Sequence, residues 1–177
     1  MKDVAEFSIV GPLQVELEEK VKGKKFANEK SGKKFWAKHP DHADAQGCYV
    51  FAFRASKGWK PFYVGQAKKG FAKETFAHHK LNKISEAIAS RSKGTLVLFL
   101  VVLERTRGKV NESAIDKVET YLILSGLAAN PDILNDKKAR DLPLKFHPTA
   151  FRVSGSCMPG WAGSATGRNA EPSASAA

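Results

Sequence analysis

GCYVFAFRASKGWKPFYVGQAKKGFAKETFAHHK, residues 47–80, is the stretch of the sequence that says most about the fold. Residues 47–54 have high β-propensity, and their aromatic side chains alternate along one face of a strand: Tyr49, Phe51 and Phe53. Residues 55–61 contain Gly and Pro and predict a turn, after which residues 62–65 return as a second strand. The segment therefore predicts an antiparallel hairpin in which each strand carries a tyrosine near a glycine.

A basic helix is expected after the hairpin, over about residues 72–91, because Gly65 and Gly70 let the backbone turn sharply. Its apolar stripe has helical spacing and consists of Ala77, Leu81, Ile84 and Ile88. The polar residues at the two borders of this stripe are Glu74 and His78 on one side, and Lys73 and Lys80 on the other. Side chains at these borders can reach a cleft beside the hairpin.

A further central strand and a second long helix complete the expected core. Residues 96–103 are apolar on both faces, as in a strand inside a sheet. Residues 112–127 have the spacing of a helix, and Glu119 lies at the border of its apolar stripe, where a carboxylate can reach a cleft without full burial. Residues 145–153 can add an edge strand or a hairpin.

Three parts are expected along the chain. Residues 1–46 are expected to contain one broken strand or two short strands at 6–17 and a short helix at 28–38, and to form an N-terminal extension or a supporting subdomain. Residues 47–153 form the main domain. Gly, Ser, Ala and Pro dominate the tail, residues 154–177, which is therefore predicted to be disordered.

The net charge of +11 is unevenly distributed. Residues 1–46 hold nine Lys and Arg against eight Asp and Glu, whereas residues 47–177 hold twenty against ten, which gives +1 and +10. Because phosphates that are neutralised release condensed counterions, such an imbalance favours a polyanionic partner, in particular nucleic acid. A basic surface that only keeps the protein soluble is the alternative.

Cys48 and Cys157 are the only cysteines, which argues against a disulfide framework and fits the reducing cytoplasm. No apolar run reaches the roughly 20 residues that span a bilayer, and the N-terminus lacks the apolar core of a secretion signal. We therefore expect a cytoplasmic protein without a membrane partner. His39, Asp41 and His42 cluster in the sequence; a metal site is one interpretation, and a solvated loop is the favoured one.

The residues near the hairpin allow phosphodiester hydrolysis. A glutamate with water is a suitable partial shell for Mg²⁺, which keeps several waters and needs few protein ligands. A tyrosine or histidine next to the attacking water can take its proton, and lysines can balance the charge of a pentacoordinate phosphate. The candidates are Tyr49, Tyr63, His78 and Glu119, and for each of them ordinary packing or exposure is the alternative.

Gly47-Cys48-Tyr49, followed by Tyr63-Val64-Gly65, resembles the two tripeptides that name the GIY-YIG nuclease superfamily. That family has a helix with an arginine and, one turn later, a histidine or tyrosine; a glutamate on a later helix and an asparagine follow. Here His78, Glu119 and Asn135 occur in this order. The resemblance covers about residues 47–135 and rests on the whole set.

The resemblance implies an α/β (α+β) fold with a small three-stranded antiparallel sheet, at about residues 47–54, 61–66 and 96–103, flanked by helices. It also implies cleavage of DNA with one Mg²⁺ or Mn²⁺. The implied roles are a metal ligand for Glu119, a general base for Tyr49, orientation of the phosphate for Tyr63, proton handling for His78 and a supporting contact for Asn135.

The family arginine has no counterpart at the expected place. One turn before the histidine lies Glu74 if His78 is matched, and Thr75 if His79 is matched. Lys69, Lys73 or Lys80 can substitute, although lysine lacks the bidentate fork of arginine. Lys73 is therefore a candidate for the catalytic set, and the lysines expected to bind nucleic acid are Lys68, Lys69, Lys73 and Lys80.

Two functions from different classes follow, with a third behind them. The first is a metal-dependent DNA endonuclease. The second is a nuclease-like module that binds nucleic acid with weak turnover or none, since the loss of one electrostatic donor commonly lowers the rate by about 10²–10³. The third is an interaction protein whose charge only confers solubility.

Overall fold

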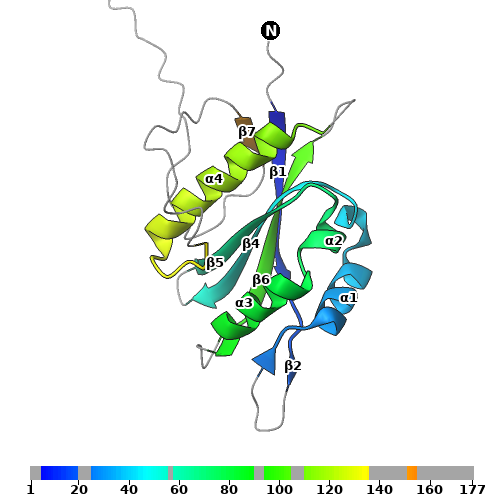
Figure 1. Cartoon of the computed structure of the whole chain (residues 1–177), viewed down its shortest axis with the longest axis vertical. Helices are drawn as coiled ribbons and strands as arrows, with labels where there is room; N and C mark the ends of the chain where they lie inside the picture. The colour runs from blue at the N-terminus through cyan, green and yellow to red at the C-terminus, as the bar shows by residue number, and fades with distance from the viewer. Residues whose placement is uncertain are drawn as a thin grey trace, which may run out of the picture.

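The computed structural model describes the following residues of the chain: 5–19, 25–55, 58–89, 94–104, 110–135 and 151–154. They form a mixed α/β fold in which one sheet lies between helices (Figure 1). The predicted tail from residue 155 onward and residues 145–150 of the expected last strand lie outside the described residues. No helix in the described part is long and apolar enough to cross a membrane.

Five strands form the main sheet, in the order β5-β4-β6-β1-β7. Their bounds are Gly58–Ala67 (β5), Gly47–Ala55 (β4), Leu96–Glu104 (β6), Ala5–Gln14 (β1) and Phe151–Ser154 (β7). The first four pair antiparallel, and β7 lies parallel to β1. The three strands expected from the sequence are present and adjacent, but the expectation of a three-stranded sheet is wrong.

The additional strand β1 comes from the part of the chain that was expected to be an extension. It pairs with β6 from Glu6 opposite Glu104 to Gln14 opposite Val97. β6 is apolar on both faces, as expected of a central strand covered on both sides, and β4 and β1 pair along its two edges. The predicted break at Gly11-Pro12 is a shift of register within one continuous strand.

Next in the chain, a two-residue ladder joins β2 (Glu18–Glu19) to β3 (Lys25–Phe26).

A bulge in the β4–β5 hairpin changes the direction of two side chains. Phe51 lies opposite Tyr63, whereas the next residue, Ala52, lies opposite Pro61. Phe62 is therefore an extra residue on β5, and it packs in the same hydrophobic cluster as Tyr63. Without the bulge, neighbouring residues of β5 would face opposite sides of the sheet.

The sheet separates two hydrophobic cores. α4 (Glu112–Ala129) covers one face, where Ile115 and Val118 are buried in the same cluster as Val50 and Val64. Three helices cover the other face (Figure 1): α1 (Glu29–Lys38), α2 (Phe71–Glu74) and α3 (His78–Ala89). β5 is an edge strand, so no further strand of the sheet lies between the two helical layers on this side.

The helix predicted over residues 72–91 is two helices, α2 and α3, with a break at residues 75–77. Thr75 accepts a hydrogen bond from Trp36 Nε1 of α1 at 3.2 Å and donates to the carbonyl of Phe71 at 2.6 Å. Phe76 packs on Gly32 of α1, where a β-carbon would lie only 2.8 Å from Phe76. Contacts with α1 therefore hold the break, and helical spacing cannot reveal them.

The predicted short helix near residues 28–38 is confirmed as α1. Asn28 caps it, because its side chain accepts a hydrogen bond from the backbone N–H of Ser31 at 2.9 Å. The helix ends at His39, as expected, and Pro40–His42 forms a single 3₁₀ turn.

Residues 130–135, which we call the edge segment, lie along β5 after α4 ends. Asn130 Nδ2 donates to the carbonyl of Pro61 at 2.7 Å, and Leu134 N donates to the carbonyl of Phe62 at 2.8 Å. The edge segment thereby supplies hydrogen bonds to backbone carbonyls on the outer edge of β5.

Candidate active site

The phenol of Tyr49 lies over Gly65. The two residues are opposite each other in the β4–β5 ladder, and a β-carbon on Gly65 would lie 2.4 Å from both Cζ and Oη of Tyr49. Tyr49 is 0% exposed, and its ring has edge contacts with Phe51 and Phe71. Because residue 65 has no side chain, the tyrosine of an inner strand can extend across the edge strand.

Tyr63 lies beside Tyr49 and is more accessible. The ring centroids are 6.3 Å apart, and Tyr63 is only partly buried. Within the described residues, the enclosed hydroxyl of Tyr49 has no partner that meets both the distance and the angle of a hydrogen bond. It does lie close enough to the hydroxyl of Tyr63 for each to affect the protonation of the other. Tyr63 is thus the outer member of the pair.

Glu119 brings a carboxylate to the same edge from the opposite helical layer. It is on α4 and is 6% exposed, although most glutamates are solvated. Its charge acts on Tyr49, Tyr63 and Lys80. The meeting is possible because β5 is the last strand on this side, so that no further strand separates the layers.

Lys80 is the buried cation at this place. It is 9% exposed, and its Nζ lies 5.2 Å from the centre of the Tyr49 ring. Nζ donates to the carbonyl oxygen of Glu74 at 2.8 Å and lies 4.0 Å from the Glu74 carboxylate. We call Tyr49, Tyr63, Glu74, Lys80 and Glu119 the edge cluster.

The surroundings shift three pKa values in the edge cluster. Burial raises the pKa of Tyr49 well above its usual value, and Tyr63, Glu74 and Glu119 raise it further. Burial, followed by the charge of Glu119, raises the pKa of Tyr63. Burial lowers the pKa of Lys80, while Glu74 and then Glu119 oppose that change. At neutral pH both phenols therefore keep their protons, and the two carboxylates favour the charged form of Lys80.

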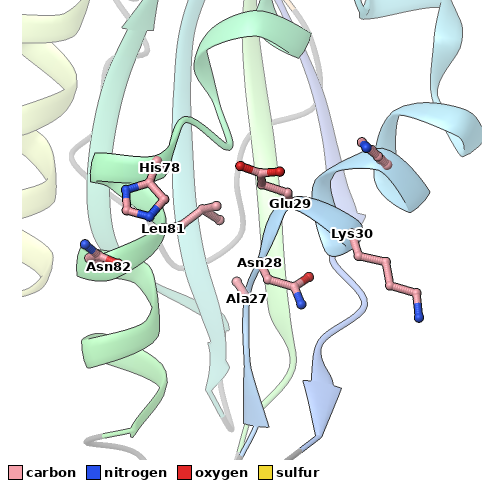
Figure 2. Close-up of a pocket in the computed structure, with 8 residues that line it drawn as sticks. Ala27, Asn28, Glu29, Lys30, His78, Leu81 and Asn82 are labelled. Atoms are coloured by element: carbon pink, nitrogen blue, oxygen red, sulfur yellow. The ribbon is translucent and has the colours of Figure 1, made fainter.

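His78, predicted to join the site, lies elsewhere. It is exposed at the start of α3 and lines a cavity of about 530 Å³ between α3 and the start of α1 (Figure 2). Figure 2 shows it near Asn82 and Leu81 of its own helix, across from Asn28. The break before α3 is the reason, since it removes the continuous helix on which His78 and Glu74 would share a border.

The lysines predicted to bind nucleic acid have three different environments. Lys68 forms ion pairs with Asp116 at 3.1 Å and Glu112 at 3.4 Å, and the hydrogen bond to Asp116 raises its pKa. Lys69 and Lys73 are exposed. Lys80 alone of the four is buried in the edge cluster, so the set does not form one surface.

Asn135 bonds the backbone of the strand that carries Tyr63. Its Nδ2 donates to the carbonyl of Val64 at 2.7 Å, and its Oδ1 accepts from Val64 N at 2.9 Å. The side chain thus takes the place of one ladder partner at the edge of β5, next to Tyr63. It holds the position of the strand and is not itself part of the edge cluster.

A divalent cation fits the edge cluster in its donor chemistry. Glu119 supplies a largely buried carboxylate, and Glu74 supplies a second one against the single ammonium of Lys80. Mg²⁺ binds through one or two carboxylates and keeps several waters. No group of three or more possible His, Cys, Asp or Glu ligands comes together within the described ranges. The enclosed hydroxyl of Tyr49 is a further oxygen without a full partner.

Sequence reasoning placed Glu74 and Lys80 at opposite borders of the apolar stripe of one helix and did not predict that they contact each other beside Tyr49. A signal for Lys80 was present, because it lies four residues before Ile84 and seven before Ala87, on the side of α3 that is buried. A lysine at such a position must either extend to water or find partners inside.

The chain was compared with protein-family models, with curated proteins and with solved structures, and none of them matches.

Proposed function

We propose that the protein is a divalent-metal-dependent endonuclease that hydrolyses phosphodiester bonds of DNA, with the edge cluster as its active site. The observation that carries the proposal is the convergence of Tyr49, Tyr63 and Glu119 at one edge of the sheet. They come from β4, β5 and α4, and Gly65 makes room for the first of them. The net charge of +11 favours a polyanionic substrate.

In the proposed reaction, water forms a bond to phosphorus, one P–O ester bond breaks, the water loses a proton and the leaving oxygen gains one. Tyr63, the accessible phenol, donates a hydrogen bond to the phosphate. Because its pKa is raised, Tyr49 carries its own proton at neutral pH and must first lose it to solvent, which positive charge entering the edge cluster would favour. The resulting phenolate then accepts the proton of the attacking water, and the leaving oxygen takes its proton from solvent.

Glu119 holds the divalent ion in this proposal, with Mg²⁺ or Mn²⁺ as the candidates. The bound ion would supply Lewis-acid activation of the water and neutralise charge on the phosphate. Asn135 keeps β5, and with it Tyr63, in register with the rest of the edge.

Nicking of supercoiled plasmid DNA tests the proposal. We expect cleavage with Mg²⁺ or Mn²⁺, none with EDTA, and a loss of at least about 10²-fold in Glu119→Gln, which keeps the size of the side chain. Glu86→Gln on the exposed side of α3 is the matched control and should cleave like the wild type. Metal-dependent cleavage that persists in purified Glu119→Gln would contradict the assignment of the edge cluster as the active site.

Two observations favour a second function, a nucleic-acid-binding module without turnover. The hydroxyl of Tyr49 is enclosed in the described conformation, and Glu74 brings a negative charge to the site. A module of this kind would bind DNA with a steep dependence on salt and give no metal-dependent product. The plasmid experiment, combined with a binding titration at several salt concentrations, separates the two functions.

A further inference from the structure

The edge cluster contains one cation, and it does not come from the place where an arginine was expected. Thr75, one of the two matched positions, is buried and bonded to Trp36 and Phe71. Glu74, the other, carries a carboxylate that accepts a hydrogen bond from Lys69 N at 2.8 Å. Neither side chain is a cation, so neither can neutralise the negative charge of a substrate phosphate.

Lys80 differs from the other lysines near the site in where its charge lies. A lysine on a helix normally extends its ammonium to water along an apolar stem. The side chain of Lys80 instead turns inward and is only 11% exposed, and its Nζ lies over the ring of Tyr49. In contrast, Lys73 on α2 and Lys83 on α3 are exposed to solvent.

The break between α2 and α3 creates the place for this ammonium. α2 ends at Glu74, so the carbonyl oxygen of Glu74 is free of a helical partner and accepts the hydrogen bond from Lys80 Nζ. Nζ has three hydrogens, and one described bond to a carbonyl leaves capacity for another acceptor. An incoming phosphate oxygen is an acceptor of that kind.

We propose that Lys80 is the residue that binds the substrate phosphate and stabilises its negative charge during hydrolysis, in place of an arginine on the preceding helix. The inference rests on the proposed function, since the edge cluster has to be the active site. On binding substrate, Nζ leaves the ring of Tyr49 for the phosphate, which also opens the enclosed hydroxyl. The neutral-amine alternative, in which Lys80 removes the proton from water, is distinguished by Lys80→Arg, because arginine keeps the charge and cannot act as a base.

Four proteins test the inference: the wild type, Lys80→Gln, Lys80→Arg and the matched control Lys83→Gln, which removes one charge from the exposed side of the same helix. Thermal unfolding first establishes that each is folded. We expect Lys80→Gln to lower kcat for plasmid nicking by about 10²-fold, Lys83→Gln to stay within about three-fold, and Lys80→Arg to recover most of the loss. A folded Lys80→Gln that cleaves like Lys83→Gln overturns the inference and leaves the proposed nuclease intact. Inactivity of Lys80→Arg equal to that of Lys80→Gln overturns it in favour of a base.

A binding measurement decides the inference if the wild type does not cleave, a result that would overturn the proposed function. Fluorescence anisotropy with a labelled single-stranded oligonucleotide at low salt compares Lys80→Gln with Lys83→Gln, which have the same net charge. A loss of affinity at least about five-fold larger in Lys80→Gln supports phosphate binding by Lys80, since one close charge pair in water is worth about 1 kcal/mol. Equal affinities overturn it.

Discussion

Gly65 and Tyr49 are sterically coupled, because a β-carbon on Gly65 would lie 2.4 Å from the hydroxyl oxygen of Tyr49. The glycine on the edge strand and the tyrosine on the next strand are thus one structural unit. The unit lets a long side chain from inside the sheet reach its edge, where Glu119 arrives from the other layer.

Replacement of this glycine should destabilise the fold through Tyr49. We expect Gly65→Ala to lower the free energy of unfolding by about 1–3 kcal/mol, because the added methyl group overpacks the site. Urea denaturation followed by circular dichroism measures it. In a Tyr49→Leu background the same substitution should have a much smaller effect, because leucine ends before the atoms that clash. Equal losses in both backgrounds would show that another contact is responsible.

Removal of the Tyr49 hydroxyl should lower the nuclease activity without lowering the stability of the fold. The hydroxyl is buried without a full hydrogen bond in the part of the chain that the structure describes, so Tyr49→Phe should leave the free energy of unfolding unchanged or raise it by up to about 1 kcal/mol. Plasmid nicking should nevertheless fall sharply. Denaturation and nicking are measured on the same preparation, and a clear loss of stability would mean that the hydroxyl has a partner in solution.

Alkaline pH should destabilise the protein through Tyr49. Its pKa is raised on folding, so between about pH 10, where an exposed tyrosine titrates, and the folded pKa the native state holds more protons than the unfolded state. The free energy of unfolding therefore falls as pH rises above about 10. Tyr63, whose pKa is also raised, acts in the same direction, whereas Lys80, whose pKa is lowered, acts in the opposite direction; the comparison with Tyr49→Phe isolates the part due to Tyr49. Denaturation at pH 9, 10 and 11 should show a shallower fall in Tyr49→Phe than in the wild type; identical slopes would contradict the assignment.

Neutralisation of Glu74 should strengthen the binding of nucleic acid. Its carboxylate lies 4.0 Å from Lys80 Nζ and competes with a phosphate for that charge. We expect Glu74→Gln to bind an oligonucleotide about five-fold more tightly at low salt, since one charge at this range contributes about 1 kcal/mol. Glu86→Gln makes the same charge change on exposed α3 and should have less effect. Anisotropy titrations compare the two, and an equal gain would point to net charge alone.

The two hydrogen bonds between Asn135 and Val64 should require an amide. Aspartate cannot donate to the carbonyl of Val64 and would place its charge next to it, so Asn135→Asp should lower the free energy of unfolding by about 1–3 kcal/mol. Asn82→Asp, on the exposed side of α3, is the control and should change little. Urea denaturation measures the free energy of unfolding of both variants. Equal losses in the two would contradict the prediction.

The local elements could be predicted from the sequence because their signals are local. Alternating aromatic residues and a Gly/Pro turn give the hairpin, an unbroken apolar run gives β6, and helical spacing gives α4. The pairing of β1 with β6 joins residues about ninety positions apart, for which a single sequence offers no marker.

Long-range contacts also decided which polar residues reached the site. The pairing of Tyr49 with Gly65 follows from the hairpin, and the position of Glu119 at a stripe border agreed with its place at the edge. The break held by Gly32 and Thr75 separates His78 from Glu74, which a helical wheel of a continuous helix cannot show. The inward position of Lys80, in contrast, agrees with its spacing from Ile84 and Ala87 within α3.

The edge segment has a consequence for how the protein behaves at high concentration. A bare strand edge is a template on which another chain can add a strand, and aggregation starts from such edges. Along β5 the carbonyls of Pro61, Phe62 and Val64 are already bonded by residues 130–135 of the same chain. A short irregular peptide from the same chain thus protects this part of the sheet edge from intermolecular pairing.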